Sequence, residues 1–223
     1  MTRVLHHFPL CPFSRKIRLQ LAEKRLASEI VEDKPWEHTD EDEPRLNPSG
    51  EVPVLQDGSR TICDSYAIAE YLEESYREVD LLGAKADDRI ETRRIMAWFD
   101  AKFNREVTER LWREKLLKRL KRLGSPNSDF VRSGLANIHI HMIYICVLYD
   151  ERNFLAGENL TLADLTAAAH LSVIDYLGDV PWETYPEAKE WYGKVKSRPS
   201  FQPLLRDRVV GIKPPIHYDD LDF

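Results

Sequence analysis

The stretch Asn47–Ser65, NPSGEVPVLQDGSRTICDS, decides the fold of this chain. Its first four residues have turn chemistry, because proline fixes φ and glycine tolerates positive φ. A short apolar run from Val52 leads to Asp57-Gly58, one of the strongest hairpin signals that a sequence can give. A partner strand follows, and Asp64 and Ser65 begin a helical pattern. The stretch therefore predicts a turn, a two-stranded hairpin and a helix start.

Pro53 is the unusual residue of this hairpin. Proline cannot donate to the ladder of a sheet, so it belongs on an edge strand or marks a special backbone geometry. A cis Val52–Pro53 bond is one explanation, since that bend exposes the backbone of Val52 to a bound peptide. An ordinary hairpin with a proline at its edge is the other explanation.

The flanking segments predict a small α/β unit followed by helices. A strand at Val4-Leu5, a helix after Cys11-Pro12 and a strand over residues 28–33 precede the hairpin, and a helix from Asp64 to about Ser75 follows it. This order resembles thioredoxin. Two long helical patterns then run over residues 87–123 and 128–150, as in a helical bundle.

A capping box opens the next predicted helix. Thr161 is placed as the N-cap and Asp164 as the third helical residue, so each side chain pairs with the backbone of the other. Leu160 is placed as the hydrophobic staple ahead of Leu165, and the apolar helix continues to Leu177.

Both motifs resemble the glutathione transferase superfamily. NPSGEVPVL with its hairpin and Asp-Ser is similar to the glutathione site, and Gly157–Asp164 resembles the folding signature GxxLTxAD of the helical domain. The resemblance spans about residues 1–208 and implies an α+β two-domain fold, with a thioredoxin-like domain over residues 1–80 and an all-helical domain over 87–208. Residues 209–223 are expected to form an extended C-terminal tail beyond it.

The same resemblance implies a glutathione site. Val52, ahead of a cis Pro53, would pair with the cysteinyl backbone of glutathione, and Asp64 and Ser65 would hold its γ-glutamyl end. Glu51 lies where several classes carry Lys or Gln, so a ligand carboxylate would meet a negative charge there.

Trp36 lies in the loop that returns to the hairpin. It would either contact the glycyl end of glutathione, as tryptophans in this loop do in some transferase classes, or cover the edge of the sheet.

Cys11 lies where the family places its activating Ser, Tyr or Cys. A thiol at a helix N-terminus is expected to have a pKa below the usual ~8.5, because the free N–H groups stabilise the thiolate. Cys11-Pro-Phe-Ser14 resembles the CPxS motif of omega-class transferases and glutaredoxins. Because Ser14 stands in place of a second cysteine, only chemistry with a single thiol is available. The alternative is an inert cysteine in a capped loop. Cys63 and Cys146 are expected to be buried hydrophobes.

Composition and net charge restrict the functions and the cellular compartment that are expected for this protein. The net charge of −6 argues against a general nucleic-acid binder, and three cysteines fit a reducing compartment. We see no signal-peptide pattern and no apolar run near the ~20 residues that span a bilayer, so a cytoplasmic protein without membrane insertion is expected. The seven histidines show no ligand spacing, so no metal is expected.

The segment Arg105–Arg122 holds eight basic residues and three acidic ones. Such runs are commonly solvated helix faces. As a functional surface, the run would bind an acidic protein segment or anionic lipid. The candidate contact residues are Arg113, Lys115, Lys118, Arg119 and Arg122.

The tail, VVGIKPPIHYDDLDF, departs from an ordinary transferase. Its two prolines exclude a helix, and its many large apolar groups either dock on the body or bind a partner; a disordered end is the alternative. Tyr218, Leu221 and Phe223 are the candidate anchors. We expect deletion of residues 217–223 to leave the fold and its stability almost unchanged.

The tail and the two segments before it, AAAHLSVIDYLGDVPWE and EWYGKVKSRPSF, resemble transferase-like cell-division proteins of alphaproteobacteria that bind FtsZ. This implies a dimeric division regulator at the division site, with a retained or vestigial glutathione site. The alternative is a glutathione-dependent transferase or thiol reductase that uses Cys11.

Overall fold

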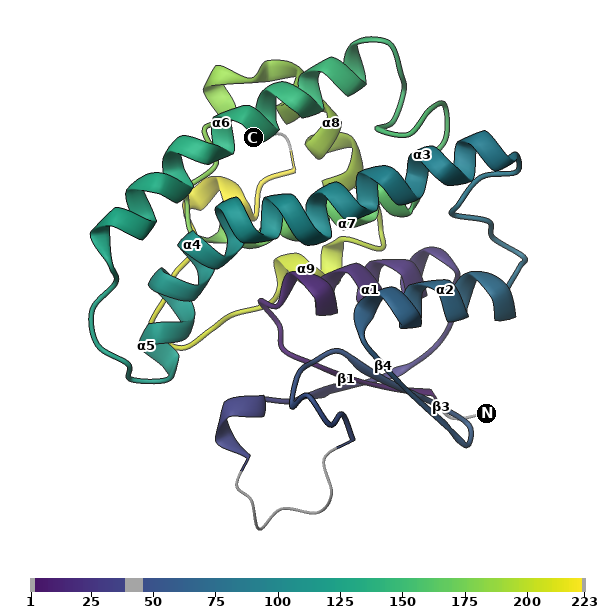
Figure 1. Ribbon diagram of the computed structural model, residues 1–223, viewed down its shortest axis with the longest axis horizontal. Coiled ribbons are helices and arrows are strands. Elements are labelled where there is room, and N and C mark those ends of the chain that lie inside the picture. Colours follow the sequence, from purple (N-terminus) through teal and green to yellow (C-terminus); the bar gives the residue numbers. More distant parts are fainter. Residues whose placement is uncertain (1–2, 39–45, 222–223) are drawn as a thin grey trace.

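The computed structural model describes residues 3–38 and 46–221. A four-stranded sheet forms one layer, with strand order β2-β1-β3-β4. Strands β1 (Arg3–His7) and β2 (Glu29–Glu32) run parallel, whereas β3 (Val54–Asp57) is antiparallel to β1 and to β4 (Arg60–Cys63). Figure 1 shows helices α1 (Pro12–Glu23) and α2 (Ser65–Ser75) between this sheet and the remaining helices.

The predicted hairpin is confirmed. Strands β3 and β4 pair with Leu55 opposite Ile62, and the tight turn between them contains Gly58 at φ +62°. The peptide bond between Val52 and Pro53 is cis, as the first of the two explanations requires. These local signals were sufficient because turn chemistry and strand pairing here involve neighbouring residues.

The first long helical pattern is one unbroken helical rod. It comprises α3 (Ala86–Ala97), the π-helical segment η2 (Trp98–Thr108), α4 (Glu109–Trp112), the π-helical segment η3 (Arg113–Leu117) and α5 (Lys118–Leu120). The wider π-type turns of η2 and η3 are not visible in a simple helical periodicity.

The second long pattern forms α6 (Ser128–Asp150), and the Asn127 side chain caps it by accepting hydrogen bonds from the N–H groups of Asp129 and Phe130. By length and composition alone α6 is apolar enough to cross a membrane, so the expectation of no membrane insertion stays a prediction. Here it packs against η2, α4 and α8 (Pro186–Lys196).

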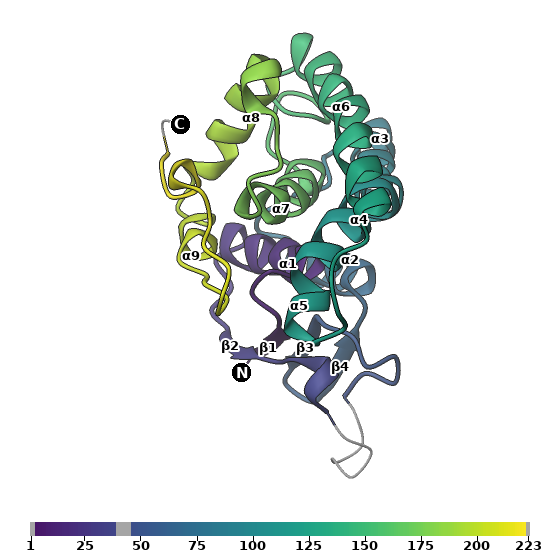
Figure 2. The ribbon, with the colours of Figure 1, turned by 90° about the vertical axis from the view of Figure 1, so that its left-hand side faces the viewer.

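Helix α7 (Leu162–Tyr176) is the centre of the molecule. All of its side chains are buried, and it packs against α1, α3, η2, α4 and α8; Figure 2 shows it in the middle of the helical part. The capping box predicted at its start is present, because Thr161 and Asp164 each bond to the other's backbone or side chain. The fold class is therefore confirmed as a thioredoxin-like α/β part joined to an all-helical part. The domain limits themselves stay a prediction.

Helix α1 joins the sheet layer to the bundle through two adjacent buried cations. The Lys16 ammonium lies 2.6 Å from a carboxylate oxygen of Asp100 in η2. The Arg15 guanidinium donates to the Ser172 hydroxyl in α7 (2.8 Å) and to the Tyr218 hydroxyl (3.0 Å). Buried charges are tolerated where each is paired and hydrogen-bonded, as both are here.

The end of the chain is part of the body rather than a detached extension. Short helices α9 (Gln202–Leu205) and η5 (Ile216–Tyr218) lie along the bundle (Figure 1). Tyr218 is fully buried, and its ring meets that of Tyr176 edge-on at 5.2 Å. The expectation that residues 217–223 can be deleted without loss of stability is therefore wrong. Phe223 lies outside the described residues.

The remaining short 3-10 helices are η1 (Pro35–Glu37) and η4 (Trp182–Thr184).

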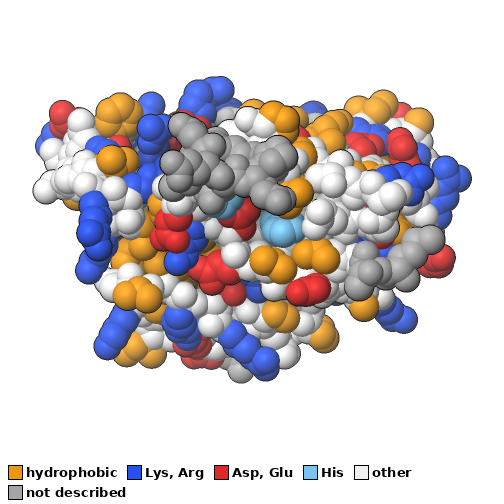
Figure 3. Space-filling view, turned by 90° about the horizontal axis from the view of Figure 1, so that it is seen from below, with side chains coloured by type: hydrophobic (Ala, Val, Ile, Leu, Met, Phe, Trp, Pro, Cys, Tyr) orange, Lys and Arg blue, Asp and Glu red, His pale blue; other side chains and the backbone are white. Residues whose placement is uncertain are grey.

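Viewed from below, the face of the molecule shows both signs of charge interspersed with apolar groups, with several acidic side chains near its middle and many basic ones toward its rim (Figure 3).

Candidate functional site

A cavity of about 330 Å³ opens beside the hairpin, between the turn at Asn47 and the start of α2. Four predicted ligand residues, Val52, Pro53, Asp64 and Ser65, line it together. The structure thus brings together both ends of the stretch that the sequence singled out. The other lining residues are Phe13, Asn47, Ser49, Glu51 and Cys63.

Two backbone features shape this cavity. Asp64 adopts φ +72° and caps α2, since its carboxylate accepts a hydrogen bond from the Tyr66 N–H at 2.7 Å. The free N–H groups at the start of this helix favour an anionic group beside Ser65. In the turn that also lines the cavity, the Asn47 amide donates to the backbone carbonyl of Glu51 at 2.9 Å and so holds the turn closed.

The sequence pattern did not identify Phe13, Asn47, Ser49 or Cys63 as individual ligand residues. Asn47, Ser49 and Cys63 belong to the hairpin stretch itself, so its boundaries were the available signal. Phe13 comes from α1 and reaches the cavity only through the fold.

Cys11 occupies the predicted position at the N-terminus of α1, but it does not line the cavity. Its side chain is only 6 % exposed, and its thiol lies 3.7 Å from the Val52 carbonyl oxygen, to which it donates. Burial raises the pKa of this thiol, and the Glu51 carboxylate adds to the rise. The expected low pKa is therefore wrong, because loss of solvent outweighs the effect of the helix N-terminus.

Ser14 has a structural position. It is fully buried, and its hydroxyl accepts a 3.4 Å hydrogen bond from the Phe8 N–H. Its hydrogen bond to Cys11 lowers the pKa of that thiol, but less than burial raises it.

Trp36 lies in η1 and does not line this cavity. Its ring packs edge-on against Phe8 at 4.9 Å, and the Lys121 ammonium lies 5.5 Å from its centre. The side chain thus joins the sheet layer to the end of α5, which fits the alternative that this tryptophan covers the sheet.

The two other thiols differ from the expectation that both are buried. Cys63 and Cys146 are partly exposed. Cys63 lines the cavity and donates to the Leu46 carbonyl at 3.3 Å. Burial raises the pKa of both thiols, and the Asp64 carboxylate raises that of Cys63 further.

The candidate partner residues of the basic segment separate into two groups. Lys115 forms a 2.6 Å ion pair with Asp179, and Lys118 forms one of the same length with Glu114. These two cations therefore stabilise the protein itself. The exposed members of the set are Arg113, Arg119 and Arg122.

The candidate anchors of the tail also differ in their exposure to solvent. Tyr218 is in the core, where no partner can reach it, whereas Leu221 is 37 % exposed. Of the predicted anchors within the described part of the chain, Leu221 alone is open to a partner.

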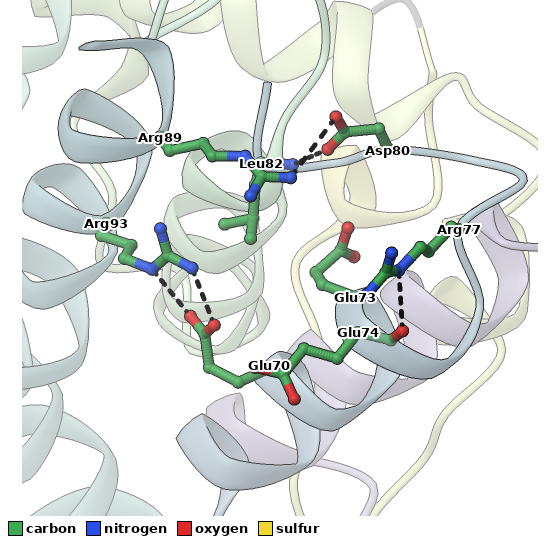
Figure 4. Close-up of a pocket in the computed structure, with 8 residues that line it drawn as sticks. All are labelled: Glu70, Glu73, Glu74, Arg77, Asp80, Leu82, Arg89 and Arg93. Carbon is green, nitrogen blue, oxygen red and sulfur yellow. Dashed lines mark hydrogen bonds and ion pairs between the residues drawn. The ribbon is translucent and has the colours of Figure 1, made fainter. Parts of the chain in front are cut away.

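A second hollow, of about 320 Å³, lies between α2 and α3 and is lined by charged side chains (Figure 4). Glu70 and Arg93 face each other across it in a bidentate pair of 2.9 and 2.8 Å. Arg89 reaches toward Asp80 at 3.9 Å. Within the described part of the chain, none of the predicted site residues lines this hollow. Among the described residues, no group of three or more His, Cys, Asp or Glu side chains is arranged to hold a metal.

Comparison with known proteins places this geometry in a family. The model of the glutathione S-transferase N-terminal domain matches residues 5–80, and that of the C-terminal domain matches residues 145–199. The chain is 49% identical to FtsZ-localized protein A of Caulobacter vibrioides, over 99% of this chain and 98% of that protein. The chain belongs to the glutathione S-transferase family.

Solved structures agree with this assignment. A glutathione S-transferase from Rhodospirillum rubrum is 56% identical, with a TM-score of 0.96 and full coverage of both chains. FzlA from C. crescentus is 48% identical, with a TM-score of 0.94 and full coverage of both chains. The likeness therefore includes the docked C-terminal segment as well as the transferase core.

Membership of the glutathione S-transferase family implies glutathione binding, and the cavity beside the hairpin is the candidate site for that ligand. The residues present fit the γ-glutamyl end of that ligand, because Asp64 suits an ammonium group and the start of α2 suits a carboxylate. Within the cavity, Glu51 provides no match for a further carboxylate.

Proposed function

We propose that this protein regulates cell division by binding FtsZ filaments through its glutathione transferase scaffold. The observation that carries the proposal is the 49% identity to FtsZ-localized protein A, which extends over nearly the whole of both chains. The solved structure of FzlA supports it with full coverage at a TM-score of 0.94.

The binding surface for FtsZ is the exposed part of the basic segment together with the end of the chain. Arg113, Arg119 and Arg122 present positive charge, and such charge attracts an acidic segment of a partner. Arg119 also lies against the tail, since a side chain at Gly211 would meet its guanidinium at 3.2 Å. Leu221 supplies an apolar contact on the same segment of the chain.

The protein acts as a homodimer in this proposal. Helix α6 exposes a stripe of apolar residues spaced as in a coiled-coil seam. Its members are Ala136, Ile140, Ile143 and Val147. A second copy of the same face would cover the stripe in a symmetric interface.

The ligand cavity is retained for a glutathione-like peptide, and the protein works in the cytoplasm at the division site. A transferase that depends on Cys11 is disfavoured. Its thiol is buried and its pKa is raised, whereas nucleophilic cysteines require the thiolate.

Fluorescence microscopy of a tagged full-length protein tests this function. We expect the protein to gather at the FtsZ ring and to disperse when FtsZ is depleted. A uniform distribution in cells that contain intact FtsZ rings would contradict the proposal.

A further inference from the structure

The cavity beside the hairpin has a one-sided charge. Its described lining contains two carboxylates, Glu51 and Asp64, and no lysine, arginine or histidine. Glutathione brings a thiol, an ammonium group and two carboxylates. A bound glutathione would therefore bring two anionic groups to a described lining in which the charged side chains are two carboxylates.

Among the described lining residues, a matching environment is present for one of these two ligand carboxylates. The start of α2 beside Ser65 offers backbone N–H groups to it, while Asp64 suits the neighbouring ammonium group. The second carboxylate, at the glycyl end, has no described basic side chain in the lining to pair with.

Glu51 is available to act on a ligand. Its backbone carbonyl is fixed by the Asn47 amide at 2.9 Å. Its carboxylate is exposed and makes no hydrogen bond or ion pair with any described residue. The charge acts across the rim of the cavity, since it contributes to the raised pKa of the Cys11 thiol.

We propose that Glu51 is a specificity-determining residue that makes this cavity select peptide-like ligands with a neutral or amine-bearing end and disfavour the free glycyl carboxylate of glutathione. This inference rests on the glutathione-type ligand site proposed above. It names the class of ligand: a γ-glutamyl peptide whose far end is uncharged or cationic.

The expected effect is moderate because the site is open to solvent. A single charge several ångströms from a ligand carboxylate changes affinity by about three- to tenfold at low ionic strength, and salt reduces the effect. Neutralising that carboxylate should restore the lost affinity, and reversing the charge of residue 51 should do the same.

Calorimetric titration at low salt tests the proposal with two probes, glutathione and glutathione amide, in which the glycyl carboxylate is a neutral carboxamide. The full-length protein should bind the amide about three- to tenfold more tightly. This preference should shrink in Glu51→Gln and reverse in Glu51→Lys. Glu78→Lys adds the same charge at an exposed position outside the cavity and should keep the preference of the unaltered protein.

Equal binding of the two probes by the unaltered protein would overturn the proposal, and so would failure of both to bind any variant. Sedimentation of the same variants with FtsZ separates this result from the proposed function. Loss of the amide preference with intact FtsZ binding overturns the ligand inference alone. Absence of FtsZ binding with an intact amide preference overturns the division role alone.

Discussion

At the scale of single residues, Cys11 shows how burial can reverse a prediction from sequence. The sequence correctly places its thiol at the start of a helix, because Pro12 and the apolar spacing are local signals. It cannot show that the Val52 carbonyl and the surrounding core cover that thiol. The same limit applies to Lys115, whose partner Asp179 lies 64 residues away.

Alkylation rates follow from this burial. At neutral pH we expect Cys63 and Cys146, which are partly exposed, to react with iodoacetamide faster than Cys11, which is 6 % exposed. Mass spectrometry of timed samples of the folded protein measures the order, and urea-unfolded protein is the control in which the difference should disappear. Labelling of Cys11 ahead of the other two would contradict the site geometry.

At the scale of elements, the start of α7 was predictable because its signal is contained in four residues. The Thr161 hydroxyl accepts from the Ala163 N–H, and one Asp164 oxygen accepts from the Thr161 N–H. The other Asp164 oxygen accepts from the Leu155 N–H and from the Trp191 indole, and these long-range bonds could not be inferred from the motif.

The two capping residues should therefore differ in importance. Thr161→Ala should lower the free energy of unfolding by about 1 kcal/mol. Asp164→Ala should lower it by about 3 kcal/mol or more, because it leaves several buried donors without a partner. Urea unfolding measures both. Asn127→Ala, which removes the exposed cap of α6, is the matched control and should cost about 1 kcal/mol. Equal effects of Thr161→Ala and Asp164→Ala would contradict the buried network.

At the scale of the whole molecule, Arg15 ties the end of the chain to its beginning. Its Nε donates to the Pro9 carbonyl at 2.8 Å, ahead of Cys11, and its other N–H groups reach Ser172, Leu204, Asp207 and Tyr218. A guanidinium has five N–H donors, so this one is fully used. The sequence pattern indicates the aromatic tail but not this arginine, since four of its partners lie between 157 and 203 residues away from it.

Removal of Tyr218 tests this connection. Tyr218→Ala should lower the free energy of unfolding by about 3 kcal/mol or more, because it opens a cavity beside Tyr176. Tyr218→Phe should cost about 1 kcal/mol through its lost hydrogen bonds to Arg15 and Leu204. Leu221→Ala is the control on the exposed part of the tail and should stay within about 0.5 kcal/mol. Unchanged stability of Tyr218→Ala would show that the tail is not docked.

Buried histidines predict how stability depends on pH. Burial lowers the pKa of His7 and of His141 to about 4, from the ordinary value of 6.5. Below pH 6.5 the unfolded chain takes up protons that these folded histidines do not, so stability is full above pH 6.5 and falls toward pH 4. At pH 5 each histidine should cost about 2 kcal/mol.

Urea unfolding at pH 7.5 and pH 5 measures this loss. His141 accepts from the Trp98 indole at 3.0 Å, a bond that a glutamine amide oxygen can also accept. His141→Gln should therefore remove part of the pH dependence. Equal stability of the unaltered protein at the two pH values would show that these histidines are not buried in their neutral form.

Co-sedimentation with FtsZ is the measurement that tests the central claim most directly. With FtsZ and GTP, the unaltered protein should pellet with the filaments, and with GDP it should remain in the supernatant. The triple variant Arg113→Glu, Arg119→Glu and Arg122→Glu should lose most of this binding at unchanged circular dichroism. Glu78→Lys, a charge change elsewhere, should retain it. If the unaltered, folded protein stays in the supernatant with GTP-assembled filaments, this scaffold does not bind FtsZ and the account is contradicted.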